Sequence, residues 1–150
     1  MTVEQDISPL VKTVTVPVGV DRAFEAFTAE TSTWWPLFGH SVGEGSARGV
    51  RLEGAVGGQI VEYGADGDIA TWGTLSEWDP PASLTFSWHP GQNPAAAGQV
   101  TVTFTPIDDG TEVKLTHTGW DRRPDATQAR RSYDTGWDYV LTKYTEFATP

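Results

Sequence analysis

Cysteine is absent from this chain of 150 residues, and no long apolar run is present. Without cysteine the protein can form no disulfide framework and can perform no thiolate chemistry. No apolar run approaches the roughly 20 residues that a membrane-spanning helix needs. The N-terminal segment MTVEQDISPL has neither a basic nor an apolar region, so we expect no secretory signal. These absences favour a soluble cytoplasmic protein that does not insert into a membrane.

Basic residues are also few. Ten Lys and Arg stand against twenty Asp and Glu, which gives a formal net charge of -10 at pH 7. Nucleic acids bind to clustered positive surfaces, so we expect no nucleic-acid partner. Anionic membrane surfaces are disfavoured for the same reason. The simplest explanation of the negative charge is its contribution to solubility.

Aromatic residues are plentiful, and they include seven tryptophans. The stretch 125–147 repeats its apolar residues with a helical period, which predicts one long amphipathic helix. Glycine at position 136 costs this helix about 1 kcal/mol relative to alanine, and we expect it to allow a neighbouring backbone or ring to approach closely. Large rings fill space less evenly than leucines, so we predict a pocket under the helix; the alternative is that the aromatic residues fill a solid core. Its apolar face consists of Tyr133, Trp137, Val140, Leu141, Tyr144 and Phe147.

Short strands and turns account for most of the remaining chain. Hairpin turns imply antiparallel pairing, and alternating apolar residues imply that one face of the sheet is covered. We therefore predict a single α+β domain over residues 1–150, with an ordered core at about 10–147, in which a curved antiparallel sheet wraps around the C-terminal helix. The expected strands are 10–16, 49–53, 59–63, 69–78, 84–88, 100–105 and 113–117, with two short helices at 22–28 and 31–35.

His117 is the first candidate for a chemical role. It shares the strand parity of Val113 and Leu115, so its side chain is expected to point toward the helix and the pocket. A histidine there could act as a general base or bind a polar group of a ligand. The alternative is a buried histidine satisfied by one hydrogen bond.

Two carboxylates are the next candidates. Glu62 shares the parity of Ile60, and Glu53 lies on the preceding strand. Two carboxylates facing one apolar pocket would raise each other's pKa and could do acid–base work. The alternative is that one or both face solvent or pair with Arg48 or Arg51, because a β-bulge would reverse the parity.

Metal and cofactor signatures are not found. His40, Glu53, Glu62 and His117 could in principle supply two histidines and two carboxylates to a metal, but their spacing matches no ligand motif such as HExxH. No phosphate-binding loop or nucleophile elbow is present either, so we expect no cofactor and no metal. Residues 37–47 and 89–98 are expected to form loops at the pocket mouth. The predicted ligand-binding residues are Trp35, His40, Trp72, Trp88, His117, Tyr133, Trp137 and Leu141.

Several segments, taken in order, resemble a known family. They are Gly57-Gly58, GTLSEWDPP (73–81), LTFSW (84–88), GTEVKLTHTGW (110–120) and Gly136-Trp137. From about residue 11 to residue 147 the chain resembles the Hsp90-ATPase-activator-homologue branch of the START-like (SRPBCC) superfamily. The resemblance implies a helix-grip fold, in which an antiparallel sheet wraps around the C-terminal helix and leaves a cavity between them. The superfamily includes lipid and hormone binders, polyketide cyclases and small hydrolases, so the fold does not decide the function.

Three functions remain open on this basis. The first is a binding module that holds an apolar or aromatic small molecule, which is favoured because no catalytic signature is found. The second is a cyclase or hydrolase that uses His117 with Glu62 or Glu53. The third, implied by the resemblance alone, is a co-chaperone of the Hsp90 type or another protein-interaction module with a chaperone partner.

Overall fold

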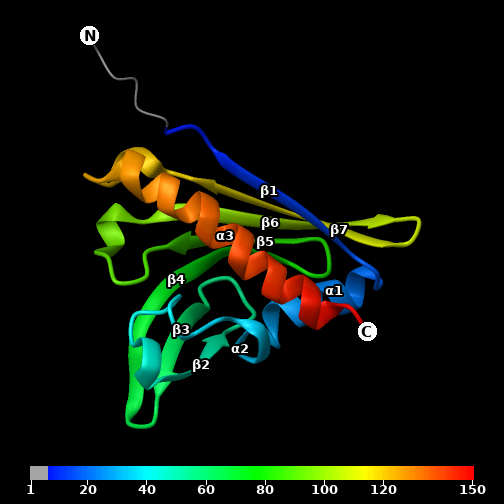
Figure 1. Cartoon of the computed structure of the whole chain (residues 1–150), viewed down its shortest axis with the longest axis horizontal. Coiled ribbons are helices and arrows are strands. Elements are labelled where there is room, and N and C mark those ends of the chain that lie inside the picture. Colours follow the sequence, from blue (N-terminus) through cyan, green and yellow to red (C-terminus); the bar gives the residue numbers. More distant parts are fainter. Residues whose placement is uncertain (1–6) are drawn as a thin grey trace.

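A seven-stranded antiparallel sheet forms the body of the molecule, and one long helix lies across it (Figure 1). The computed structural model describes residues 7–150. Residues 1–6, which carry part of the expectation about a secretory signal, lie outside this range. The strands are β1 (Leu10–Val16), β2 (Ala47–Leu52), β3 (Gln59–Gly64), β4 (Gly67–Asp79), β5 (Ser83–Trp88), β6 (Gly98–Ile107) and β7 (Gly110–Thr118). The helices are α1 (Val20–Thr28), α2 (Thr31–Trp34) and α3 (Ala126–Ala148), with 3₁₀ turns η1 (Glu44–Ser46), η2 (Pro94–Ala96) and η3 (Trp120–Arg122).

The strand order is β1-β7-β6-β5-β4-β3-β2. Strands β2 to β7 therefore pair in sequence as successive hairpins, and β1 joins the sheet beside the last strand. The register shifts at 47/49, 60/61, 62/63 and 75/77 all involve β2, β3, β4 or β5. Such β-bulges bend and twist a sheet, and Figure 1 shows β4 curving away from the flatter β5–β7 half. The curvature creates the concave face on which the helix lies.

The core fills the space between this concave face and the helices. Alternate residues of β6 and β7 are buried, as the sequence pattern predicts. They belong to the same hydrophobic core as Trp137, Val140, Leu141 and Tyr144 of α3. The Tyr144 hydroxyl donates a hydrogen bond of 2.8 Å to the carbonyl of Ala23, which joins α3 to α1. Burial of the ring raises the pKa of Tyr144, so it remains a hydrogen-bond donor at neutral pH.

The fold agrees with the α+β, helix-grip prediction, and α3 begins and ends one residue later than the predicted stretch 125–147. No helix within residues 7–150 combines the length and the apolar character that crossing a bilayer requires. The expectation for Gly136 is wrong. A Cβ atom built there would meet no heavy atom of residues 7–150 within 4 Å, because this side of the helix faces an open pocket instead of another backbone or ring.

Replacing Tyr144 with phenylalanine tests the link between α3 and α1. The Tyr144→Phe variant is expected to lose about 1 kcal/mol of unfolding free energy in urea denaturation, because a buried hydrogen bond disappears while the ring stays in place. Tyr139→Phe is the matched control, since Tyr139 is exposed on the same helix. Equal stabilities of the two variants would contradict a structural role for the Tyr144 hydroxyl.

Candidate functional site

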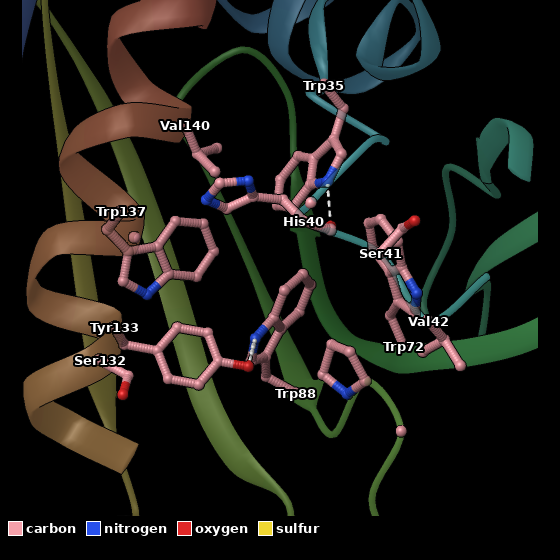
Figure 2. A pocket seen from close by; sticks show the side chains of 14 residues that line it. Trp35, His40, Ser41, Val42, Trp72, Trp88, Ser132, Tyr133, Trp137 and Val140 are labelled. Carbon is pink, nitrogen blue, oxygen red and sulfur yellow. Dashed lines mark hydrogen bonds between the residues drawn. The ribbon is translucent and has the colours of Figure 1, made fainter. Parts of the chain in front are cut away.

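A pocket of about 390 Å³ lies between α3 and two loops, one within residues 37–43 and one following β5. Figure 2 shows it with the side chains that surround it. The loop 37–43 and Trp35 form one side, which we call the lip. Ser132, Tyr133, Gly136, Trp137 and Val140 of α3 form the opposite side, and Trp72, Trp88, Pro90 and Gly91 complete the wall.

Four indole rings dominate the wall, and each comes from a different element. Trp35 follows α2, Trp72 lies on β4, Trp88 ends β5 and Trp137 lies in α3. Their ring centres are 5.0 Å apart for Trp35–Trp72, 5.6 Å for Trp72–Trp88 and 5.4 Å for Trp88–Trp137. All three pairs are tilted or edge-on, which is the favourable geometry for aromatic pairs. The rings therefore pack on one another and hold the wall in place without a ligand.

The N–H group of each of these indoles already has a partner in the protein. Trp72 donates to Glu62 at 2.9 Å, and Trp35 donates to the carbonyl of His40 at 2.8 Å. Trp88 donates to the Tyr133 hydroxyl at 3.2 Å, which Figure 2 shows near the centre of the pocket. Trp137 donates to His117 Nδ1 at 3.0 Å. The indoles consequently offer a ligand their apolar ring surfaces and none of their N–H groups.

His117 lies behind the pocket wall, where its side chain is 2% exposed. Its ring centre is 4.0 Å from that of Trp120 and 5.1 Å from that of Tyr133. Because Nδ1 accepts the Trp137 N–H, the proton of the neutral ring resides on Nε2. Burial, and secondarily the positive charge of Arg123, lower the pKa of His117 to about 3. At neutral pH it is a weak base that orients Trp137.

Glu62 is completely buried, and both carboxylate oxygens accept hydrogen bonds. Oε1 accepts from the backbone N–H of Val42 at 2.8 Å as well as from Trp72, and Oε2 accepts from the N–H of Gly43 at 2.6 Å. A Cβ atom at Gly43 would lie 2.9 Å from Oε2 and 2.8 Å from Ile69, so a larger residue there would require these side chains to shift. Glu62 therefore fastens the lip to the Trp72 side of the wall.

Glu53 is exposed, and its Oε1 accepts the backbone N–H of Gln59 at 3.0 Å in the turn after β2. Neither Glu53 nor Glu62 shares a hydrogen bond with His117 in the described chain, since the bonds of each lead elsewhere. The predicted pairing of histidine with carboxylate is therefore not assembled. Within residues 7–150, no three His, Asp or Glu side chains gather into a possible metal site.

Six of the eight residues predicted to bind a ligand line the pocket, namely Trp35, His40, Trp72, Trp88, Tyr133 and Trp137. The structure places His117 and Leu141 outside its wall: the Trp137 and Tyr133 rings pack over His117, and Leu141 is buried in the core. Sequence reasoning missed Ser132 and Gly136. Ser132 and Gly136 are four residues apart, so they lie on one side of the helix, and each directly precedes a predicted pocket residue, Tyr133 or Trp137. This spacing could have indicated that they line the pocket.

The lip contacts α3 through His40. Its ring stacks on Tyr139 at 4.9 Å with an interplanar angle of 20°. In Figure 2 the His40 ring reaches from the lip toward the helix and lies near Val140. Within residues 7–150, the Nδ1 atom of His40 is buried and has no hydrogen-bond partner. An unpaired buried nitrogen is costly, so this end of the pocket contains a polar group that the described residues do not satisfy.

Replacing Glu62 with glutamine tests its hold on the lip. The amide NH₂ cannot accept a hydrogen bond, so at least one N–H donor loses its partner. We expect Glu62→Gln to lose about 1–3 kcal/mol of unfolding free energy and to speed amide hydrogen exchange at Val42 and Gly43. Glu53→Gln is the control, because the amide oxygen there can still accept the Gln59 N–H. Unchanged exchange at Val42 and Gly43 would show that Glu62 does not hold the lip.

The depressed pKa of His117 predicts a pH dependence of stability. The folded protein resists protonating this ring until about pH 3, whereas the unfolded chain binds the proton near the ordinary value of 6.5. The unfolding free energy must therefore fall as the pH drops from about 6.5 toward 3. Between pH 7 and pH 5 we expect the wild type to lose about 2 kcal/mol more than His117→Gln, measured by urea denaturation. Parallel pH profiles would mean that His117 titrates normally in the folded protein.

Comparison with known proteins identifies the family. The model of the Activator of Hsp90 ATPase homolog 1-like proteins matches residues 17–148. Protein MLL2253 from Mesorhizobium loti has a TM-score of 0.68 at 19% identity, over 93% of this chain and 95% of that chain. CalU16 from Micromonospora echinospora has a TM-score of 0.66 at 20% identity, over 93% and 73% of the two chains. At these identities the two likenesses concern the fold alone.

A third structure is more similar in sequence. The anthrahydroquino-γ-pyrone synthase Txn09, complexed with SUM, is 31% identical, with a TM-score of 0.59 over 86% of this chain and 88% of that chain. No curated protein sequence gives a match. Since the family model spans all but the ends of the chain, the protein belongs to the Activator of Hsp90 ATPase homolog 1-like family.

Proposed function

We propose that this protein binds a flat aromatic small molecule in the pocket beneath α3. The observation that carries the proposal is the wall of four indoles, each with its N–H already bonded inside the protein. Such a surface is complementary to the face or edge of an aromatic ring and offers little to a strongly polar ligand. The volume of about 390 Å³ also falls in the range of small-molecule sites, roughly 300–1,000 Å³.

Tyr133 supplies a polar group for orientation. Its oxygen accepts the Trp88 N–H, and its own proton is free to be donated to a ligand. Burial raises the pKa of Tyr133, so the hydroxyl keeps its proton at neutral pH. A ring system with one hydrogen-bond acceptor, such as a carbonyl oxygen, fits this arrangement.

The relation to Txn09 supports a ligand with fused aromatic rings, because that relative is named as a synthase of an anthrahydroquino-γ-pyrone. The same relation favours a second candidate function, a ring-forming enzyme in which this pocket positions a substrate. In such an enzyme the indole wall would position the substrate and Tyr133 would donate a proton to it. His117 would not take part with a carboxylate, since among the described residues it forms no hydrogen bond with either Glu53 or Glu62.

Two probes test the binding function. Anthraquinone has carbonyl acceptors, and 1-aminoanthracene has the same three rings without them. We expect isothermal titration to show binding of both to the wild type. Tyr133→Phe should weaken the binding of anthraquinone about fivefold to tenfold, because one hydrogen bond is lost. The affinity for 1-aminoanthracene should be nearly unchanged. Equal effects on both probes would contradict the orienting role of Tyr133, and no binding of either to the wild type would contradict the proposed function.

Turnover separates the two candidate functions. The wild type and Tyr133→Phe are incubated with the substrate of the Txn09 synthase, and products are followed by chromatography with mass detection. A new product formed by the wild type and reduced in the variant would favour the enzyme. Binding of that substrate without conversion would favour the binding module.

A further inference from the structure

Gly136 has no structural reason to be glycine. Among the glycines of the described chain it alone lies inside an α-helix, and α3 continues through it from Ala126 to Ala148. Its φ is not in the left-handed region, and a Cβ atom there would meet no heavy atom within 4 Å. By contrast, a Cβ at Gly73 would collide with the backbone of Ser87 at 1.7 Å. A helix interior favours alanine over glycine, so the fold gains nothing from the missing side chain at position 136.

The space above Gly136 is part of the pocket. On a helix surface the neighbours of residue 136 are the residues three and four positions away. These are Ser132, Tyr133, Tyr139 and Val140. Of these, Ser132, Tyr133 and Val140 line the pocket together with Gly136 and the adjacent Trp137. The open space above the helix backbone at Gly136 is called the notch below.

The side chains one turn before and one turn after Gly136 are held by contacts that do not involve Gly136. Tyr133 is fixed by its hydrogen bond with Trp88, and its ring packs 5.1 Å from His117. Tyr139 is stacked on His40 of the lip. The notch is therefore a fixed feature of the wall, and its depth depends on the absence of a side chain at position 136.

Glycine is the residue that lets a ligand approach the backbone closely. We infer that Gly136 is a specificity-determining residue: a ring of the bound ligand lies in this notch against the helix backbone, and the missing side chain allows a system of three fused rings instead of two. This inference rests on the proposed function, because it concerns the width of ligand that the same pocket accepts.

The test compares Gly136→Ala with the wild type on two probes, 1-aminoanthracene with three rings and 1-aminonaphthalene with two. The added methyl group occupies the notch, so we expect binding of the three-ring probe to weaken about tenfold, the lower end of what one carbon is worth in an apolar pocket. Binding of the two-ring probe should change less than about threefold, since it can seat on the indole wall alone.

Thermal unfolding of the same variant supplies an independent readout. Alanine should raise the melting temperature of Gly136→Ala, because it favours the helix and meets no neighbour. Weaker binding of the larger probe by a more stable protein cannot be explained by damage to the fold. Thr135→Ala, an adjacent exposed position outside the pocket wall, controls for a general effect of alanine in α3 and should leave both affinities unchanged.

The outcomes separate the inference from the proposed function. If the wild type binds both probes and Gly136→Ala binds them equally well, or weakens both to the same extent, Gly136 does not set the width of the site and the inference is wrong. If the wild type binds neither probe, the proposed function fails and the inference fails with it. If Gly136→Ala loses affinity for the three-ring probe only, the result supports both the inference and the proposed function.

Discussion

Each indole of the pocket wall brings an N–H group that needs an acceptor, because an unpaired buried donor costs about 1–3 kcal/mol. The four acceptors come from four different places: the Glu62 carboxylate, the His40 carbonyl, the Tyr133 hydroxyl and the His117 ring. Satisfying these donors therefore ties β3, the lip, α3 and β7 to the same wall. The shape and the apolar character of the pocket both follow from this set of bonds.

The same requirement accounts for the positions of Glu62 and His117, which are hydrogen-bonded to the indole wall and not to each other. A histidine that accepts an indole N–H inside the core is most stable when neutral, and the buried carboxylate of Glu62 already accepts three N–H groups. Glu62 and His117 stabilise and orient the wall. Tyr133 is the polar side chain that joins this network and also faces the cavity.

The sequence predicts the architecture well because periodicity reports on burial. The aromatic stripe of α3 and the hairpin order of the strands could be read from spacing alone, and so could most of the wall. Parity correctly grouped Glu62 with the buried Ile60, because the extra residues at the register shifts between β3 and β4 lie on β4. It could not show that Trp137 packs over His117. The openness at Gly136 depends on which neighbours are missing in three dimensions, and no local pattern encodes that.

The spacing of the indoles has an optical consequence. Trp34, Trp35, Trp72, Trp88 and Trp137 form a continuous series in which ring centres are 5.0–6.0 Å apart. At such separations excitation energy absorbed by one ring passes readily to the next. A bound ligand that accepts this energy from any one of the five rings would therefore quench the fluorescence of all of them. Binding of such a ligand could then be followed by the intrinsic tryptophan fluorescence, without a label.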